Sequence, residues 1–302
     1  MRVAVVGATG MIGGAVARAL LARGDEVVAV SRRGRAGIDG AQDVRWDPVE
    51  GGPPAAAVEA DAVVNAAGSK NDLLPWTAAR KREYYESRVG TTRLLAGALD
   101  AARGPRVLVN ASGADYYGPR EEPADEGAPP GSTFLAGICV AWEREASRAE
   151  ERGLRVVRLR AGVVLSTKGG ALPQLARPVR LFVGGPIGGG RQWLPWIHVD
   201  DQVGLNLRAL DEDRLAGPVN AAAPGIVRQR EFVTDLARVL GRPAVVPTPA
   251  IALRLVLGEK ATLALDSRHI VPRAALEAGY AFRFTQPEPA LRDLLGEAAN
   301  SV

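Results

Sequence analysis

The sequence predicts an α/β protein with a Rossmann-type, doubly wound parallel sheet and a smaller, mainly helical C-terminal lobe. Three observations carry this prediction. A glycine-rich turn at 7–13 stands directly between an apolar run at 2–6 and an apolar-periodic helix at 11–23. Strand and helix patterns alternate through the first half of the chain. After Gly162 this alternation loosens into Gly- and Pro-rich segments and further helices.

The bulk properties exclude several classes of protein. The chain has 302 residues and 47% apolar content, enough for one large or two modest cores. No apolar run is long enough to span a membrane, and the chain begins with a strand pattern, so we expect neither a membrane segment nor a signal peptide. The single cysteine, Cys139, excludes an internal disulfide and fits a reducing, cytoplasmic location. Acids and bases are interspersed, so we expect no nucleic-acid partner.

The glycine turn has the properties of a dinucleotide-binding turn. Gly7 permits a sharp turn off the strand, Gly10 lets a phosphate approach the backbone, and Gly13 lets the helix pack against the strand. The helix N-terminus then offers free N–H groups to a pyrophosphate. A glycine-rich turn without a ligand is the alternative. The cofactor-binding residues predicted here are Gly7, Thr9, Gly10, Met11, Ile12 and Gly13.

The other elements follow in order along the chain. Apolar runs predict strands at 26–30, 44–46, 61–66, 106–111 and 155–160. Helical periodicity predicts long helices at about 77–101 and 136–152. This alternation predicts a parallel sheet with helices on both faces.

The second half of the chain predicts the smaller lobe. Residues 169–191 are rich in Gly and Pro, the run 196–201 opens a helix to about 210, and 218–222 is one more strand. From Gln229 onward helical segments are punctuated by prolines. We therefore expect a nucleotide-binding domain of residues 1–165 plus 196–223, and a substrate-side lobe of residues 166–195 plus 224–302.

The end of the second strand predicts which dinucleotide binds. An acid at this place binds the ribose 2′-hydroxyl of NAD, whereas an arginine accommodates the 2′-phosphate of NADP. The strand ends in Ser31-Arg32-Arg33, without an acid. We therefore predict NADP(H), with Arg32 a stronger candidate than Arg33, and a solvated basic turn is the alternative. After the 61–66 strand, Asn65, Ala66, Ala67 and Gly68 are small enough for the adenosine side of the cofactor to lie against the backbone.

Several motifs resemble the short-chain dehydrogenase/reductase superfamily. They are GATGMIGG at 7–14, Asp61 followed by NAAG, Ser112 followed by Tyr-Tyr-Gly, the run 160–165, and WIHVDD at 196–201. A second set of motifs narrows the resemblance to one subgroup of this superfamily. These motifs are SGADYYG at 112–118, CVAWE at 139–143, the run 184–201, and Gly258-Glu259 with AGYAFRF at 278–284. They resemble the atypical "epimerase family protein" subgroup, which is NAD-dependent epimerase/dehydratase-like with a small C-terminal domain.

The resemblance implies a catalytic Tyr-x-x-x-Lys pair, which this chain lacks. Glu143 resembles the acid found four residues after the lysine, so Cys139 stands at the lysine position and Leu135 at the tyrosine position. No other Tyr-x-x-x-Lys occurs in the sequence. A nucleotide-sugar epimerase is therefore disfavoured, because that reaction needs the same pair.

Three residues remain as catalytic candidates. Ser112 matches the superfamily's serine, and its alternative role is to satisfy backbone groups at the strand end. Tyr116 and Tyr117 follow Ser112 in the same loop, where one of them is a candidate to reach the nicotinamide and supply the missing phenol. The alternative is one packed ring and one ring that lines the substrate site. Cys139 is expected to be a small buried side chain and not a nucleophile.

The resemblance also implies contacts near the nicotinamide. The backbone of Gly162 and Val163 would bond the carboxamide, and Ala111 lies among the cofactor-contacting residues. Ser69-Lys70-Asn71 departs from the subgroup's Glu-Pro-Ile pattern. Lys70 is a candidate for a positive group near the ribose. No metal site is predicted.

The Gly-rich segment that leads to Trp196 is predicted to form a roof over the site. An Arg191 flanked by Trp193 and Trp196 suits an anionic or flat substrate, and a loop anchored by two tryptophans is the alternative. His198 resembles a structural position tying the second lobe to the sheet, with a general-base role as the alternative. His269 is expected to pack in the lobe or lie on the surface.

These observations predict an NADP(H)-dependent oxidoreductase or epimerase-like enzyme that acts on an unidentified small molecule. The alternative is a non-catalytic NADP(H)-binding sensor or scaffold, which the missing Tyr–Lys pair favours. Extended relatives commonly dimerise through two long helices, so we also expect a homodimer through helices 77–101 and 136–152.

Overall fold

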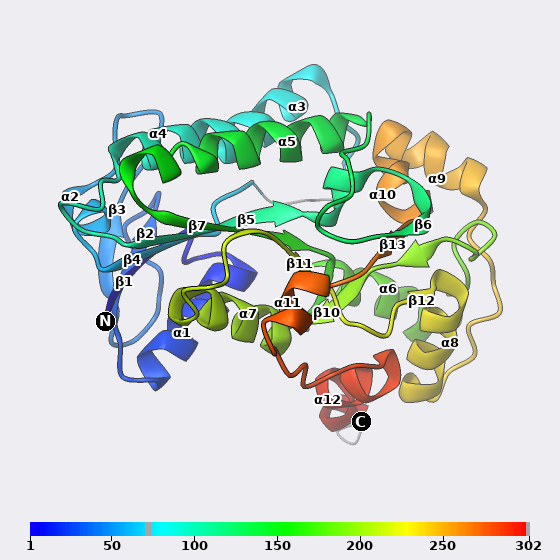
Figure 1. Ribbon diagram of the computed structural model, residues 1–302. Coiled ribbons are helices and arrows are strands. Elements are labelled where there is room, and N and C mark those ends of the chain that lie inside the picture. The colour runs from blue at the N-terminus through cyan, green and yellow to red at the C-terminus, as the bar shows by residue number, and fades with distance from the viewer. Residues whose placement is uncertain (70–73, 300–302) are drawn as a thin grey trace.

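A parallel sheet forms the centre of the structure, a computed structural model that describes residues 1–69 and 74–299 (Figure 1). The sheet has seven strands in the order β11-β7-β5-β4-β1-β2-β3, and every neighbouring pair is parallel. The strands are β1 (Arg2–Val6), β2 (Glu26–Ser31), β3 (Gln42–Arg45), β4 (Ala62–Asn65), β5 (Val107–Gly113), β7 (Arg155–Ala161) and β11 (Gly217–Ala221). This confirms the predicted fold class.

Helices cover both faces of the sheet, which is why its central strands β1 and β4 are apolar and almost completely buried, whereas the edge strand β3 is polar and largely exposed. One face is covered by α1 (Met11–Ala22) and α7 (Val199–Asp211), and the other by α3 (Ala78–Tyr85), α4 (Thr91–Ala98) and α5 (Phe134–Ser147). The short helix α2 (Ala55–Val58) precedes β4. Val5, Leu20 and Leu205 belong to the core on the first face, and Leu95 and Leu108 to the core on the second.

The long helix expected at 77–101 is interrupted. A π-helical turn, Glu86–Gly90, separates α3 from α4, and α4 ends at Ala98. Apolar periodicity alone does not distinguish such a turn from regular helix, because the turn adds a single residue. Turns of this kind recur at functional sites, and this one carries Arg88.

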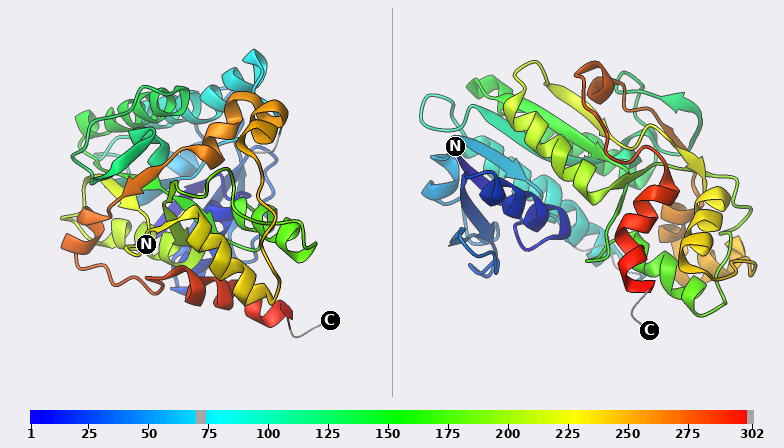
Figure 2. Two further views of the ribbon diagram at one scale, coloured as in Figure 1. Left: turned by 90° about the vertical axis from the view of Figure 1, so that its right-hand side faces the viewer. Right: turned by 90° about the horizontal axis from the view of Figure 1, so that it is seen from below.

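The remaining elements form small sheets and helices beside the carboxyl edge of the large sheet (Figure 2). Strand β8 (Val163–Leu165) pairs with β10 (Trp196–His198), β9 (Trp193–Leu194) with β12 (Val227–Arg228), and β6 (Arg120–Ala124) with β13 (Arg268–Ile270). The helices are α6 (Ala171–Arg180), α8 (Gln229–Leu240), α9 (Ala250–Leu257), α10 (Thr262–Leu265), α11 (Arg273–Glu277) and α12 (Pro287–Ala299). A third core joins Leu172, Trp196, Phe232 and Leu291.

Two features of this region differ from the sequence pattern. Residues 169–191 stand out in the sequence only as rich in Gly and Pro, but helix α6 forms within them and buries Leu172, Ala176 and Val179. The chain from Ala274 to Phe282 returns to the core of the large sheet, where Ala275 is completely buried. Tertiary packing of an apolar face decides both cases.

The described helices include none that combines the length and the apolar content needed to cross a bilayer.

The packing of the glycine turn against α1 makes a stability prediction. A Cβ atom on Gly13 would lie 2.4 Å from the carbonyl oxygen of Gly7. We expect Gly13→Ala to lower the free energy of unfolding by about 1–3 kcal/mol, because the turn must shift to admit the methyl group. Gly97→Ala in α4, where an added Cβ meets nothing within 4 Å, is the control and should be neutral or slightly stabilising. Urea unfolding measures both, and a Gly13→Ala variant as stable as wild type would contradict this packing.

Candidate functional site

The glycine turn is closed tightly against the backbone of the turn that follows β4. Gly7 has a φ of +84°, and a Cβ atom there would lie 2.8 Å from the carbonyl carbon of Ala66. Gly10 is the N-cap of α1 and offers no capping side chain, so the first N–H groups of the helix lack that partner. Thr9 and Gly10 are exposed. The turn therefore presents backbone donors and little side-chain bulk, as a pyrophosphate requires.

Polar groups without partners gather at the end of β2. Ser31 is buried, yet its Oγ has no hydrogen-bond partner within residues 1–69 and 74–299. Arg32 and Arg33 are exposed, and neither forms an ion pair with any residue in those ranges. No carboxylate ends this strand. A hydroxyl and two guanidiniums in this state suit a phosphate group.

Asn65 shapes the turn after β4 from beneath. Its Nδ2 donates to Thr92 Oγ1 at 2.8 Å and to Asn110 Oδ1 at 2.7 Å, and its Oδ1 accepts from the backbone N–H of Ala67 at 3.2 Å. The side chain is therefore occupied inside the protein. The half-buried Ala66 and Ala67 and the exposed Gly68 leave the backbone of the turn accessible. Lys70 and Asn71 lie outside the described residues.

A buried ion pair between Glu143 and Arg160 lies behind the predicted catalytic residues. Arg160 Nε and Nη2 donate to the two carboxylate oxygens of Glu143, each at 2.8 Å. Both side chains are almost completely buried. Burial alone would lower the pKa of Arg160, but hydrogen bonding and attraction to Glu143 outweigh it and raise the pKa. The guanidinium is therefore a fixed charge inside the protein.

This ion pair also occupies the hydroxyl of Ser112. Ser112 Oγ donates to Glu143 Oε1 at 2.7 Å, and the residue is 5% exposed. A hydroxyl has one proton, so this one cannot also donate to a substrate carbonyl.

The two tyrosines have different surroundings. Tyr117 is buried, donates its hydroxyl to Asn220 Oδ1 at 2.7 Å and accepts from Arg160 Nη1 at 2.8 Å. Burial raises the pKa of Tyr117 to about 12, and both hydrogen bonds of its hydroxyl are made inside the protein, as the packed-ring alternative expects. Tyr116 is half-buried, with Arg160 Cζ 3.5 Å from its ring centroid. Its hydroxyl has no hydrogen-bond partner in the described part of the chain, so Tyr116 alone keeps a free phenol.

The two positions that align with the superfamily's catalytic tyrosine and lysine are buried in this structure. Leu135 and Cys139 are both buried on the inner face of α5. Burial is the main cause that raises the pKa of the Cys139 thiol to about 12. The thiol therefore stays protonated and unreactive at neutral pH.

The backbone N–H groups at the end of β7 are used within the protein. Gly162 donates its N–H to the carbonyl of Ala221 at 2.9 Å, and Val163 donates to the carbonyl of Pro195 at 2.7 Å. The predicted contact with a nicotinamide carboxamide would therefore have to involve backbone carbonyl groups, and it stays a prediction. The carbonyl of Ala111 accepts from Asn110 Nδ2 at 2.7 Å.

Two charged residues, Asp115 and Arg88, lie beside the predicted site residues but were not among them. Asp115 forms a 2.9 Å ion pair with Arg268 of β13, and Arg268 Nε is buried without a partner among the described residues. Arg88 lies against the turn after β4, with its Cζ 3.5 Å from the ring centroid of Tyr84. One signal was present in the sequence, because Tyr84 and Arg88 have the Tyr-x-x-x-cation spacing on a helix.

The predicted roof residues separate into two groups. Trp196 is fully buried and donates its Nε1 to the carbonyl of Gly225, as an anchor does. Trp193 is half-buried, between Arg228, whose Cζ is 3.8 Å from the ring centroid, and the ring of His269 at 4.4 Å. Arg191 lines a neighbouring cavity of about 460 Å³.

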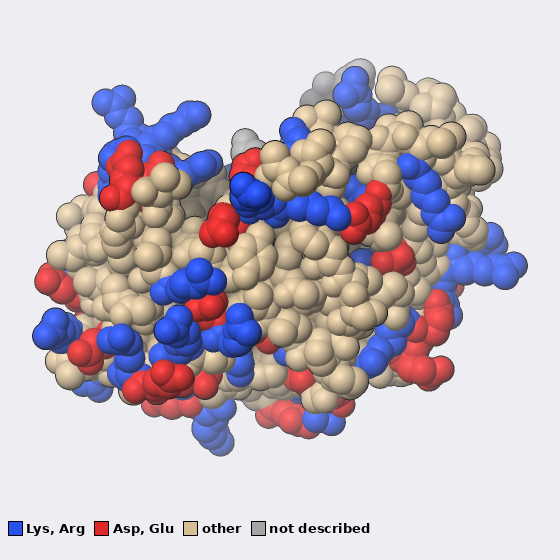
Figure 3. All heavy atoms as spheres, turned by 90° about the horizontal axis from the view of Figure 1, so that it is seen from above, with Lys and Arg blue, Asp and Glu red and all other residues tan. Residues whose placement is uncertain are grey.

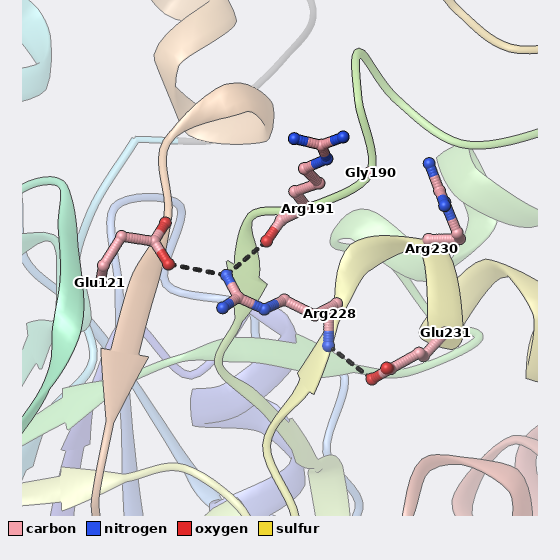
Figure 4. A pocket seen from close by; sticks show the side chains of 6 residues that line it. All are labelled: Glu121, Gly190, Arg191, Arg228, Arg230 and Glu231. Atoms are coloured by element: carbon pink, nitrogen blue, oxygen red, sulfur yellow. Dashed lines mark hydrogen bonds and ion pairs between the residues drawn. The ribbon is translucent and has the colours of Figure 1, made fainter.

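Figure 4 shows this cavity at the beginning of α8. Arg228 crosses it and donates to a carboxylate oxygen of Glu121 at 2.7 Å, whereas the side chains of Arg191 and Arg230 extend from separate elements. Glu231 accepts from the backbone N–H of Arg228. Arg228, which lines the cavity, also lies over the ring of Trp193. Figure 3 shows basic and acidic side chains interspersed over the upper face of the molecule.

His198 ties α7 to the C-terminal segment. Its Nδ1 accepts from the backbone N–H of Asp200 at 3.0 Å, and its Nε2 lies 3.3 Å from a carboxylate oxygen of Asp293 in α12. Its ring stacks on Phe284 with a centroid distance of 4.1 Å. The residue is 1% exposed, so it serves as a structural tie.

Comparison with known proteins defines the class. The NAD dependent epimerase/dehydratase family matches residues 3–222, and a domain of unknown function matches residues 248–294. The chain therefore belongs to the NAD dependent epimerase/dehydratase family.

Curated relatives place the chain more narrowly. The mouse epimerase family protein SDR39U1 is 38% identical, over 98% of this chain and 100% of its own length. The Bacillus subtilis epimerase family protein YfhF is 32% identical, over 98% and 99%. These matches confirm the resemblance to the epimerase family protein subgroup.

A solved structure of a relative contains a cofactor. Human epimerase family protein SDR39U1 (isoform2), solved with NADPH, superposes with a TM-score of 0.88 at 36% identity, over 100% of both chains. A UDP-galactose 4-epimerase superposes with a TM-score of 0.77 at 20% identity, which shows a shared fold.

The buried ion pair makes a stability prediction. We expect Glu143→Gln to lower the free energy of unfolding by about 3–5 kcal/mol, because it leaves Arg160 buried without a counter-charge. Glu50→Gln breaks the exposed Arg45–Glu50 pair and is the matched control, which should leave the unfolding midpoint nearly unchanged. Urea unfolding measures both. Equal small effects of the two variants would show that the Glu143–Arg160 pair does not hold the site together.

The surroundings of His198 predict a pH dependence. Burial lowers the pKa of His198 below its usual 6.5, against the opposing carboxylates of Asp200, Asp293 and Asp201 and together with the cation of Arg283. The folded state therefore favours the neutral ring, whose contribution to stability is complete above about pH 6.5 and decreases as the pH falls through the folded pKa.

Proton NMR tests this directly, because the chain has two histidines. The ring signal that persists in His269→Gln should titrate below 6.5, and the unfolding free energy should fall between pH 7.5 and 5.5. A midpoint at or above 6.5 for that signal would contradict the assignment of a buried neutral ring.

Proposed function

We propose that this protein is an NADP(H)-dependent oxidoreductase or epimerase-like enzyme that acts on a small molecule without the usual Tyr-x-x-x-Lys pair. The observation that carries the proposal is the end of β2, where a buried Ser31 hydroxyl and the guanidiniums of Arg32 and Arg33 lack partners within the described ranges. The NADPH present in the human relative supports the same cofactor.

The chain's own residues would hold the dinucleotide in two places. The backbone of Gly10, Met11 and Ile12 would donate to the pyrophosphate, and Ser31 with Arg32 would bind the 2′-phosphate. When bound, NADPH supplies a hydride. The open backbone of Ala66, Ala67 and Gly68 would border the cofactor, with Asn65 holding that turn in place.

Acid–base work would fall to Tyr116, because Ser112 and Tyr117 are occupied by the buried network. The small lobe, residues 166–195 plus 224–302, would face the substrate. A homodimer through the α3–α4 and α5 region remains part of the proposal.

A non-catalytic NADP(H)-binding sensor or scaffold is the second candidate. Leu135 and Cys139 favour it, because neither side chain can replace the tyrosine or the lysine. A sensor would use the same glycine turn and basic strand end, and would bind NADPH without oxidising it.

Calorimetry with NADPH and NADH tests the cofactor assignment. Wild type should prefer NADPH, and Arg32→Ala should weaken NADPH binding about tenfold or more, because a guanidinium–phosphate contact is lost. Arg214→Ala is the control: the Arg214 side chain is 93% exposed and pairs only with Glu212 among the described residues, so this variant should bind as wild type does. Equal affinities for both cofactors, or an Arg32→Ala variant that binds normally, would contradict the assignment.

Turnover separates the two candidate functions. The NADPH-loaded protein is mixed with a panel of aldehydes, ketones and quinones, and absorbance at the reduced-nicotinamide band is followed. Oxidation that slows in Tyr116→Phe supports the enzyme. Binding without oxidation by any member of the panel supports the sensor.

A further inference from the structure

Arg88 is a half-buried guanidinium whose acceptors are all neutral. Its Nη1 donates to the carbonyl of Tyr84 and to Ser87 Oγ, each at 3.3 Å, and its Nη2 donates to the carbonyl of Ser69 at 3.1 Å. No carboxylate of the described residues lies within ion-pair distance of it. Its Nε has no acceptor there either. A cation removed from water in this way is costly unless an anion joins it.

The surrounding rings hold Arg88 in a fixed orientation. Its Cζ lies 3.5 Å from the ring centroid of Tyr84 and 5.7 Å from that of Trp142. Such stacking leaves the edge of a guanidinium free for hydrogen bonding. The residue also belongs to the π-helical turn Glu86–Gly90, which displaces it from the register of a regular helix.

Arg88 also lies at the carboxyl edge of the sheet. A Cβ atom on Gly68, in the turn after β4, would be 3.0 Å from Arg88 Cζ. The lack of a side chain at Gly68 therefore lets the guanidinium reach this turn. Ligands of doubly wound folds bind outside the carboxyl ends of the strands, at this edge.

The carboxyl end of the neighbouring strand, β5, adjoins the corner that Arg88 and the turn after β4 form. A Cβ atom on Gly113 of β5 would lie 3.6 Å from Cys139 Sγ and 3.7 Å from Asp115 Oδ2. Trp142, which faces Arg88, follows Cys139 by one helical turn on α5. Asp115 is paired with Arg268, so its carboxylate is already neutralised from the other side. Arg88 thus remains the cation without a counter-charge in this corner of the described structure.

We propose that Arg88 is an anion-binding residue of the site. Its guanidinium holds a negatively charged or partly charged oxygen, supplied either by a phosphate of the dinucleotide or by a carboxylate or carbonyl group of the substrate. Tyr84 is a positioning residue that supports the plane of the guanidinium. This inference rests on the proposed function for the presence of a ligand at this edge, and it assigns the recognition chemistry there.

The test removes the charge and keeps the hydrogen bonding. In Arg88→Gln the side-chain amide can still donate to the carbonyl of Ser69, and Arg88→Lys restores the charge. Arg82→Gln, on the exposed side of the neighbouring helix α3, is the matched control. Calorimetry measures two probes: NADPH, and sodium benzoate as an aromatic carboxylate, the latter with and without saturating NADP⁺.

The expected result is a loss of about tenfold or more in the affinity for at least one probe in Arg88→Gln. Arg88→Lys should recover most of that affinity, and Arg82→Gln should bind as wild type does. A loss confined to NADPH identifies a cofactor phosphate as the partner. A loss confined to benzoate identifies the substrate.

Unchanged affinities for both probes in Arg88→Gln would overturn the proposal, and so would a wild-type protein that binds neither. A melting curve checks folding. If Arg88→Gln does not fold, phenylglyoxal modification of Arg88 in wild type is followed by mass spectrometry: protection by NADPH or benzoate supports the proposal, and equal rates overturn it. The proposed function fails separately, through the response of Arg32→Ala to NADPH.

Discussion

The buried ion pair between Glu143 and Arg160 is the interaction on which the rest of the site depends. It joins α5 to β7, and a guanidinium enclosed in this way must have its donors occupied. Arg160 therefore donates a hydrogen bond to the hydroxyl of Tyr117, and Glu143 accepts a hydrogen bond from the hydroxyl of Ser112. Two of the three hydroxyl groups that the motifs offer for catalysis, those of Ser112 and Tyr117, are thus part of the internal structure.

The open polar groups lie farther along the same carboxyl edge of the sheet, beside β2 and β4. Ser31 and Arg32 follow β2, Arg88 lies against the turn after β4, and the first turn of α1 lacks a capping side chain. Among the described residues, a buried hydroxyl without a partner at Ser31, an unpaired guanidinium at Arg32 and a cation with only neutral acceptors at Arg88 are groups that an anionic ligand at this edge would satisfy. Leu135 and Cys139 are buried on the inner face of α5, so they contribute no reactive group to this edge.

Much of the fold could be predicted from local pattern. The glycine turn with its flanking strand and helix, and the β-branched runs of the sheet, are set by periodicity and by backbone requirements that a short window contains. The π-helical turn at Glu86–Gly90 and helix α6 could not, because packing decides them. The site was harder still: the partners of Ser112 and Tyr117 lie on other elements, so their side chains could not be assigned as free or occupied. Arg88 was missed because its significance depends on the absence of a counter-charge within residues 1–69 and 74–299, which only the folded arrangement reveals.

The most direct measurement is a crystal structure of this protein grown with NADPH. The account predicts electron density along the glycine turn, with the 2′-phosphate in contact with Ser31 and Arg32. Density for the 2′-phosphate away from the end of β2, or a glycine turn that stays free of ligand at saturating NADPH, would contradict the claim that the unpartnered groups along this edge exist to bind the dinucleotide.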